Sequence, residues 1–383
     1  MKKNRNENKK RRGIGVFLNV VIMLACVFPL LVLDSFPTAE LINRIGLLAA
    51  EAYVIAVMIV SFIVSVMVHE AGHLVFGLMS GYGFCSYRIF NIIWLKTDDG
   101  IKVKKYSVPG TAGQCLMTPP EIKDGKMPTV IYNLGGSLLG FAFAGICLGV
   151  EYLLKDTPFI STALIFLTAI NLYTALINFI PMKTAAINND GMNALSLKSS
   201  PEAIESFRIQ LLMNAEISRG VPLTDMPDEW FEMPSVDKLD DPMIAARAYL
   251  RFVRLFTEWR YSEARELGNY LLENASLAGL HRAQIVNDLG FIAAVEGDYA
   301  VATRIFKKTR PDYANMYKKN ISAFRSDYAY DKLVRRSEAG ANMNLRLFRA
   351  LIERMENYAS SHEIEHELEL IDLVDAIYDK ITE

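Results

Sequence analysis

The sequence predicts an all-α polytopic membrane protein that carries a small cytoplasmic β-hairpin insertion and a soluble, C-terminal α-helical domain. Three observations favour this fold class: long apolar stretches in the first half, a β-rich interruption between two of them, and a charged helical pattern in the second half. A helix needs ~20 residues to cross a bilayer. Four stretches meet that length and are predicted to span: residues 14–33, 47–79, 129–154 and 159–180.

The first twelve residues are rich in Lys and Arg, and cytoplasmic segments carry an excess of these residues. The span at 14–33 resembles a signal peptide but is long and lacks a small-residue cleavage site, so it is predicted to stay as a signal anchor. The loop at 81–128 is also basic, whereas the other connections are short and poor in Lys and Arg. We therefore expect a multi-pass protein of the cell membrane with both termini in the cytoplasm.

The loop at 81–128 contains two β-rich runs, residues 87–94 and 101–108, joined by a turn at 97–100. They predict a hairpin directly after the second span. Its exposed edge would suit an extended substrate that adds as a strand. A purely structural hairpin fits the pattern equally well.

After the last span, residues 201–220 predict an amphipathic helix, and residues 221–242 predict a linker that contains Pro and Asp. Residues 243–383 predict a helical domain. Segments 255–264 and 293–302 align at a spacing of 38 residues and resemble a degenerate tetratricopeptide-type hairpin. An irregular helical bundle is the alternative, and either form offers a surface for a protein partner.

Charge and cysteine content exclude two classes of protein. The formal net charge is −2, which argues against a nucleic-acid partner because phosphate binding requires a basic face. The four cysteines show no CxxC spacing, so no disulfide framework is expected.

The HEAGH segment at residues 69–73 ends the apolar run of the second span. Helical positions i and i+4 share a face, so His69 and His73 can bind one Zn²⁺ while Glu70 lies beside the metal-bound water. Ionisable groups in a membrane are costly and are usually retained for function. The segment therefore predicts a hydrolytic metal site near the cytoplasmic surface.

A second copy of the motif, HEIEH at residues 362–366, lies in an acidic helix near the end of the chain. No third ligand follows it, and its surroundings are typical of a solvated helical face. We therefore predict a metal at the first copy and none at the second.

A catalytic zinc site needs a third protein ligand, and Asp190 is the best candidate. It lies just past the cytoplasmic end of the fourth span, the same side on which the second span ends. Taken alone, its Asn-Asp-Gly context is also an ordinary turn signal.

These residues resemble the site-two protease family of intramembrane zinc metalloproteases. That family combines HExxH in one membrane helix with NxxPxxxxDG at a later one, matched here by residues 69–73, by Asn178 and Pro181, and by the Asp190-Gly191 pair. The resemblance covers the second to fourth spans. It implies zinc on His69, His73 and Asp190, Glu70 as the catalytic acid and base, and Asn178 as a substrate-facing group.

The chain departs from the family motif in one place, since Pro181 and Asp190 are nine positions apart instead of five. Asn188 and Asn189 are then alternative ligands, but a carboxylate is the better one. Asn133 in the third span is predicted to line the site, as a second substrate-binding residue. The glycines that follow it, Gly135 to Gly149, are predicted to pack helices closely.

The sequence thus predicts a zinc metalloendopeptidase that cleaves membrane-spanning segments of regulatory proteins or signal-peptide remnants. One alternative is an inactive membrane scaffold whose helical domain binds partners. The other is a metal transporter, for which the spans lack the distributed charges of an ion path.

Overall fold

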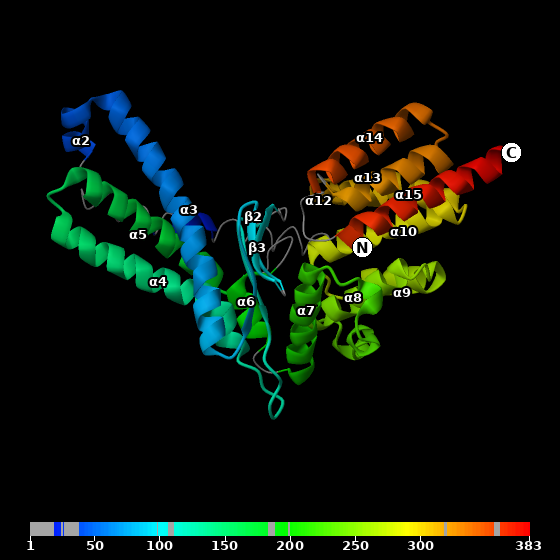
Figure 1. Ribbon diagram of the computed structural model, residues 1–383, viewed down its shortest axis with the longest axis horizontal. Coiled ribbons are helices and arrows are strands. Elements are labelled where there is room, and N and C mark those ends of the chain that lie inside the picture. The colour runs from blue at the N-terminus through cyan, green and yellow to red at the C-terminus, as the bar shows by residue number, and fades with distance from the viewer. Residues whose placement is uncertain are drawn as a thin grey trace. The chain divides into compact units, whose positions relative to one another are not determined.

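The computed structural model describes residues 19–23, 26, 38–97, 99–105, 111–182, 188–197, 200–317, 320–355 and 361–383 (Figure 1). The chain divides into two compact units, which are described separately. One contains the residues up to Ser200 except 95–106, and the other contains residues 95–106 and 201–383.

Three helices of the first unit are long and apolar enough to span a membrane: α3 (Leu47–Met79), α4 (Thr129–Leu154) and α5 (Pro158–Phe179). They match the second, third and fourth predicted spans to within one residue. The predicted span at 14–33 lies largely outside the described residues. Within it, the structure describes residues 19–23 and 26, and these are helical. The unit also contains the short helices α2 (Thr38–Ile45) and α6 (Asp190–Ser196).

Helices α3, α4 and α5 pack against one another (Figure 1). Polar side chains link α3 to α5 at two levels. Tyr53 donates a hydrogen bond to the carbonyl of Phe159 at 2.6 Å, and Ser65 donates one to Thr174 at 2.9 Å. These bonds satisfy polar groups that would be costly to leave unpaired in lipid.

The insertion between α3 and α4 is a four-stranded antiparallel sheet, so the predicted simple hairpin is corrected. Its strands are β1 (Gly83–Ile89), β2 (Ile92–Thr97), β3 (Gly100–Lys105) and β4 (Gly113–Thr118), in the order β3-β2-β1-β4. The predicted strand at 87–94 is broken by a tight turn at Phe90, which has a φ of 52°. Strand β2 ends at Thr97 and β3 begins at Gly100, the bounds predicted for the turn, and β4 pairs with β1.

Helix α7 (Pro201–Arg219) confirms the amphipathic helix predicted at 201–220. The predicted linker at 221–242 forms three short 3₁₀ turns, η1 (Leu223–Asp225), η2 (Asp228–Phe231) and η3 (Val236–Lys238). Met226 and Phe231 from this segment pack into one apolar cluster with Ile209 and Met213 of α7. The segment is therefore part of the packed unit and does not act as a free spacer.

From Pro242 onward, the residues that the structure describes are mainly helical, as predicted. The elements of this part are α8 (Pro242–Thr257), α9 (Tyr261–Asn274), α10 (Gly279–Val295), α11 (Tyr299–Arg304), η4 (Ile305–Thr309), η5 (Arg310–Tyr313), α12 (Ala314–Tyr317), α13 (Ile321–Ala329), η6 (Tyr330–Val334), α14 (Glu338–Met355) and α15 (Ser361–Thr382).

Two helical hairpins in this unit share the predicted spacing of 38 residues. The turn between α8 and α9 has a left-handed residue at Trp259 (φ 61°), and the turn between α10 and α11 has one at Gly297 (φ 82°). Ala264 and Ala302 follow at equivalent positions and are both fully buried. The assignment of these hairpins to the tetratricopeptide type stays a prediction.

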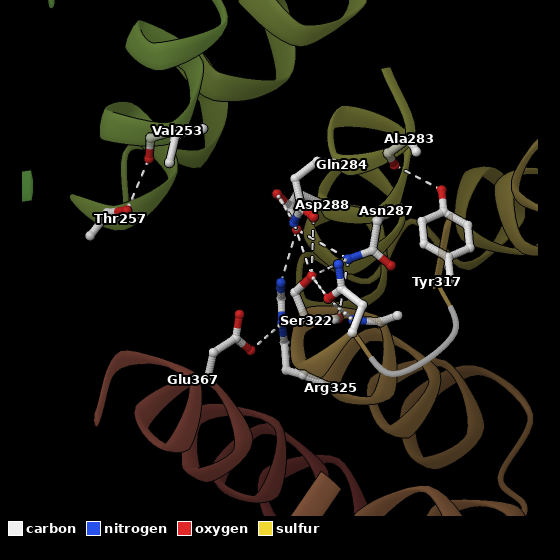
Figure 2. A network of polar contacts seen from close by, with 12 residues as sticks. Val253, Thr257, Ala283, Gln284, Asn287, Asp288, Tyr317, Ser322, Arg325 and Glu367 are labelled. Atoms are coloured by element: carbon white, nitrogen blue, oxygen red, sulfur yellow. Dashed lines mark hydrogen bonds and ion pairs between the residues drawn. The ribbon is translucent and has the colours of Figure 1, made fainter. Parts of the chain in front are cut away.

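A buried arginine joins three helices of the second unit (Figure 2). Arg325 of α13 is fully buried and pairs with Asp288 of α10 at 2.9 Å and Glu367 of α15 at 3.0 Å. Its guanidinium also lies 4.4 Å from the ring centre of Phe291. Removing one partner of such a pair would leave a buried charge uncompensated, so this contact ties α15 firmly to the core.

Candidate metal centre

The two histidines of the first motif lie one helical turn apart on α3 and face the same point. Their Nε2 atoms are 3.2 Å apart. The side chain of His69 is 12% exposed and that of His73 is 11% exposed. Both imidazoles therefore reach a nearly buried site from one helix face, as the i, i+4 spacing predicts.

Glycines allow α4 to approach the motif. A Cβ atom added to Gly72 would lie 2.7 Å from the Cα of Gly136, and one added to Gly136 would lie 2.5 Å from Cε1 of His69. The predicted packing role holds at this crossing. It does not hold for Gly145 and Gly149, where an added Cβ would meet no atom within 4 Å.

The backbone of α4 orients His73. The Nδ1 atom of His73 lies 2.9 Å from the carbonyl oxygen of Tyr132, which can only accept a hydrogen bond. The proton is thereby assigned to Nδ1, and the lone pair of Nε2 is left for a ligand. Nδ1 of His69 is buried and has no hydrogen-bond partner among the described residues.

Asn189 positions the third candidate ligand by joining the end of α5 to the start of α6. Its amide nitrogen donates to the carbonyls of Ile177 at 2.7 Å and Ile180 at 2.6 Å. Its Oδ1 accepts from the backbone N–H groups of Met182 at 2.9 Å and Met192 at 3.0 Å. Asn189 thus satisfies groups that helix ends leave unpaired, and its side chain acts as a cap instead of a ligand.

Gly191 brings this cap against α5. A Cβ atom at position 191 would lie 2.7 Å from the carbonyl carbon of Phe179 and 2.9 Å from the carbonyl oxygen of Asn178. Only glycine permits so close an approach of the two backbones. Glycine is therefore required for steric reasons at the second position of the Asp190-Gly191 pair.

The structure brings Asp190 to both histidines. Its Oδ2 lies 3.1 Å from Nε2 of His69 and 3.3 Å from Nε2 of His73. The three atoms form a nearly equilateral triangle. Ligands bonded to a tetrahedral metal at ~2.0 Å are separated by ~3.3 Å, so the triangle has the dimensions of one face of a zinc coordination sphere.

The charge state of Asp190 suits the same interpretation. Burial disfavours the carboxylate, but the neighbouring imidazoles of His73 and His69 outweigh burial and hold the pKa of Asp190 well below its usual range. Its Oδ2 is buried and faces the Nε2 atoms of the two imidazoles. Two imidazole nitrogens and one ionised carboxylate are a donor set that fits zinc.

Glu70 lies next to these residues and is directed at the sheet. Its side chain is buried and contacts Gly113 of β4. It interacts electrostatically with His73, His69 and Asp190. A carboxylate beside two histidines and a third ligand is the arrangement that metal-assisted hydrolysis uses for proton transfer.

The structure does not join the two predicted substrate-binding residues to the ligand triangle. Asn133 is buried and donates to the carbonyl of Thr129 at 2.8 Å, while Asn178 donates to the carbonyl of Thr174 at 3.0 Å. Both bonds stay within their own helices. Their role towards a substrate remains a prediction.

Sequence reasoning missed several residues that shape this site. Tyr132 orients His73 through its carbonyl, which no side-chain pattern reveals. Asn189 was considered as an alternative ligand and as part of a turn, although Asn directly before a short helix is also a capping signal. Gly113 and Arg88, in and beside the unrecognised strand β4, carried no local signal.

The comparisons with known proteins give no identification. No family model matches this chain, and no curated protein or solved structure is significantly similar to it. The resemblance to site-two proteases therefore rests on the motif residues themselves.

Proposed function

We propose that this protein is an intramembrane zinc metalloprotease that cleaves membrane-spanning segments of regulatory proteins or signal-peptide remnants. The observation that carries the proposal is the triangle formed by His69 and His73, in the last third of an apolar helix of 33 residues, with Asp190 of α6. We further propose that the protein resides in the cell membrane with both termini and the ligand triangle on the cytoplasmic side, as the distribution of Lys and Arg favours.

The proposed chemistry assigns one role to each group. Zinc held by His69, His73 and Asp190 would polarise the scissile carbonyl and make its bound water acidic. Glu70 would accept the proton of the attacking water and pass it to the leaving amine. The Nδ1 bond of His73 to Tyr132 keeps the imidazole oriented throughout.

The sheet offers an edge at which the substrate would be held. A helical peptide bond is shielded by its own hydrogen bonding, so a membrane segment must unwind before hydrolysis. Strand β4 is at one edge of the sheet, and its residue Gly113 contacts Glu70. We propose that the unwound segment lies in extended form near β4, which would present its backbone to Glu70.

A second candidate function is a membrane scaffold without catalysis. It is favoured by the size of the second unit, which has its own apolar cluster and its own buried ion pairs. On this alternative the helical hairpins bind a partner protein, and the ligand triangle is a remnant.

The two functions are separated by a comparison of matched variants in cells. We would express the wild type, Glu70→Gln and Glu363→Gln, and measure membrane-protein fragments by mass spectrometry. The protease proposal predicts that Glu70→Gln loses cleavage by roughly 10²- to 10⁴-fold. It should retain zinc, and Glu363→Gln should match the wild type. Identical fragment profiles from all three chains would support the scaffold.

A further inference from the structure

Position 113 in strand β4 requires glycine because the side chain of Glu70 lies against it, and not because of its backbone conformation. Its φ is not among the positive values found at Gly81, Gly100 or Gly125, so an L-residue could adopt its conformation. A Cβ atom at position 113, however, would lie 2.5 Å from Oε1 of Glu70, 2.6 Å from its Cγ and 2.9 Å from its Cδ. The carboxyl group of Glu70 therefore occupies the space that any other side chain at 113 would need.

The side chain of Arg88 in strand β1 donates hydrogen bonds to the segment that contains Gly113. Its side chain is 1% exposed. It donates to the carbonyl of Phe90 at 2.6 Å, to the hydroxyl of Thr111 at 2.5 Å and to the carbonyl of Gly113 at 3.1 Å. One guanidinium thus fastens the β1–β2 turn to the start of β4.

The geometry of Arg88 is specific to a guanidinium. Its planar fork presents several donors in fixed directions, whereas a lysine ammonium is a single compact charge on a flexible stem. Arg88 also interacts electrostatically with Glu70. The cation therefore acts on the carboxylate both through the strand that it fixes and through its charge.

We propose that Gly113 and Arg88 are positioning residues that together form a seat for the carboxylate of Glu70. The inference rests on the proposed function, in which Glu70 transfers protons. A general base must be held within about 0.5 Å of its productive position. The backbone of β4 on one side and helix α3 on the other hold the carboxylate of Glu70 in its position.

The atoms that a methyl group at 113 would meet belong to the flexible side chain of Glu70, so the methyl group would displace that side chain, while strand β4 keeps its fold and loses some local stability. Gly113→Ala should therefore fold and bind zinc like the wild type. Its kcat should fall by roughly 10²-fold, the effect of a displacement of about 1 Å, while KM changes little. The visible spectrum of the cobalt-substituted protein should be unchanged, because the three ligands do not move. Gly145→Ala, at a glycine with open space, is the matched control and should retain full activity.

A double-mutant cycle tests the pairing of the two seat residues. Arg88→Met should lower kcat, Arg88→Lys should restore part of it, and Gly113→Ala should cost less in the Arg88→Met chain than in the wild type. Additive effects, or a Gly113→Ala protein with wild-type kcat, would overturn the inference.

A readout that is independent of catalysis separates this inference from the proposed function. Glu70→Ala removes the atoms that the added methyl group would meet. Hydrogen exchange of residues 111–118 should therefore respond to Gly113→Ala in the wild-type background and not in the Glu70→Ala background. Equal responses would overturn the seat. A wild-type protein that neither binds zinc nor cleaves membrane segments, but shows this coupling, would refute the proposed function alone.

Discussion

The chain contains two HExxH segments, and the structure gives them different surroundings. In the first, His69 and His73 meet Asp190 from another element, and their Nε2 atoms lie 3.2 Å apart. In the second, the ring of His366 packs 5.5 Å from the ring of Trp259, and its Nδ1 lies 3.6 Å from Oε2 of Glu369, which is 63% exposed. Among the described residues, only the first copy forms a three-ligand group. The motif supplies two ligands, and a metal site needs the fold to bring a third.

The difference extends to the residues around each motif. Gly72 sits inside the first copy and lets α4 approach, whereas the neighbour of the second copy, Glu367, forms an ion pair with the buried Arg325. The first segment contributes to a group of three residues that could hold a metal ion, and the second lies against a packed helical core. Each prediction below tests this difference between the two HExxH segments.

The largest expected effect is the loss of zinc from the first copy. His69→Ala removes one of three protein ligands and should abolish stoichiometric zinc and peptide cleavage. His366→Ala should leave zinc and cleavage unchanged and cost about 1 kcal/mol of stability through lost packing. Metal analysis of both purified proteins checks this. Zinc loss in His366→Ala would refute the contrast.

The next effect concerns the helix crossing. Gly72→Ala places a methyl group against the carbonyl oxygen of Gly135 and 2.7 Å from both the carbonyl carbon of Gly135 and the Cα of Gly136, and backbone atoms cannot move aside easily. We expect a loss of about 1–3 kcal/mol and a weaker zinc site. Thermal unfolding in detergent measures the first, and competition with a chelator measures the second. Gly145→Ala is the control, and an equal result for both variants would show that the crossing does not shape the site.

A smaller effect is expected at the cap that carries Asp190. Asn189→Ala removes the hydrogen bonds to Ile177, Ile180, Met182 and Met192 while the ligands remain. Zinc affinity should fall roughly 10- to 100-fold, as for other residues that orient metal ligands. Asn269→Ala, which removes one exposed bond within its own helix, should leave zinc affinity unchanged. Wild-type affinity in Asn189→Ala would contradict the capping role.

The smallest effect on the metal site is expected from a pH dependence of stability that is confined to the helical unit. Burial lowers the pKa of His281, which stacks on Tyr249 with ring centres 4.1 Å apart, to about 4. The unfolded chain takes up this proton near pH 6.5, so the stabilisation is complete above about 6.5 and is lost as pH falls towards 4. The loss should reach about 3 kcal/mol at pH 4, measured by hydrogen exchange of α10. His281→Phe should flatten this slope, and an unchanged slope would contradict the assignment.

Local patterns explain why much of the fold was predictable. The apolar run of α3 and the i, i+4 spacing of its histidines need no tertiary information. The same holds for α4, α5 and the turn at 97–100, where composition and turn residues mark the boundaries. Asp190 was predicted from a motif, since its loop alone suggested only a turn.

The missed features depend on contacts between distant segments. The turn at Phe90 interrupts a continuous β-rich run with no Gly or Pro to mark it, and a positive φ is uncommon for such a residue. The requirement for Gly113 exists only because Glu70 packs against it from another element. Similarly, the predicted linker at 221–242 is polar enough to suggest a spacer, yet Phe231 anchors it in a core.

The most direct test of this account is the metal content of the purified wild-type chain combined with X-ray absorption at the zinc edge. The account predicts one zinc per chain, bound by two imidazoles and a carboxylate, with no sulfur ligand. A protein without stoichiometric zinc, or with zinc retained after His69, His73 and Asp190 are all replaced by alanine, would contradict it.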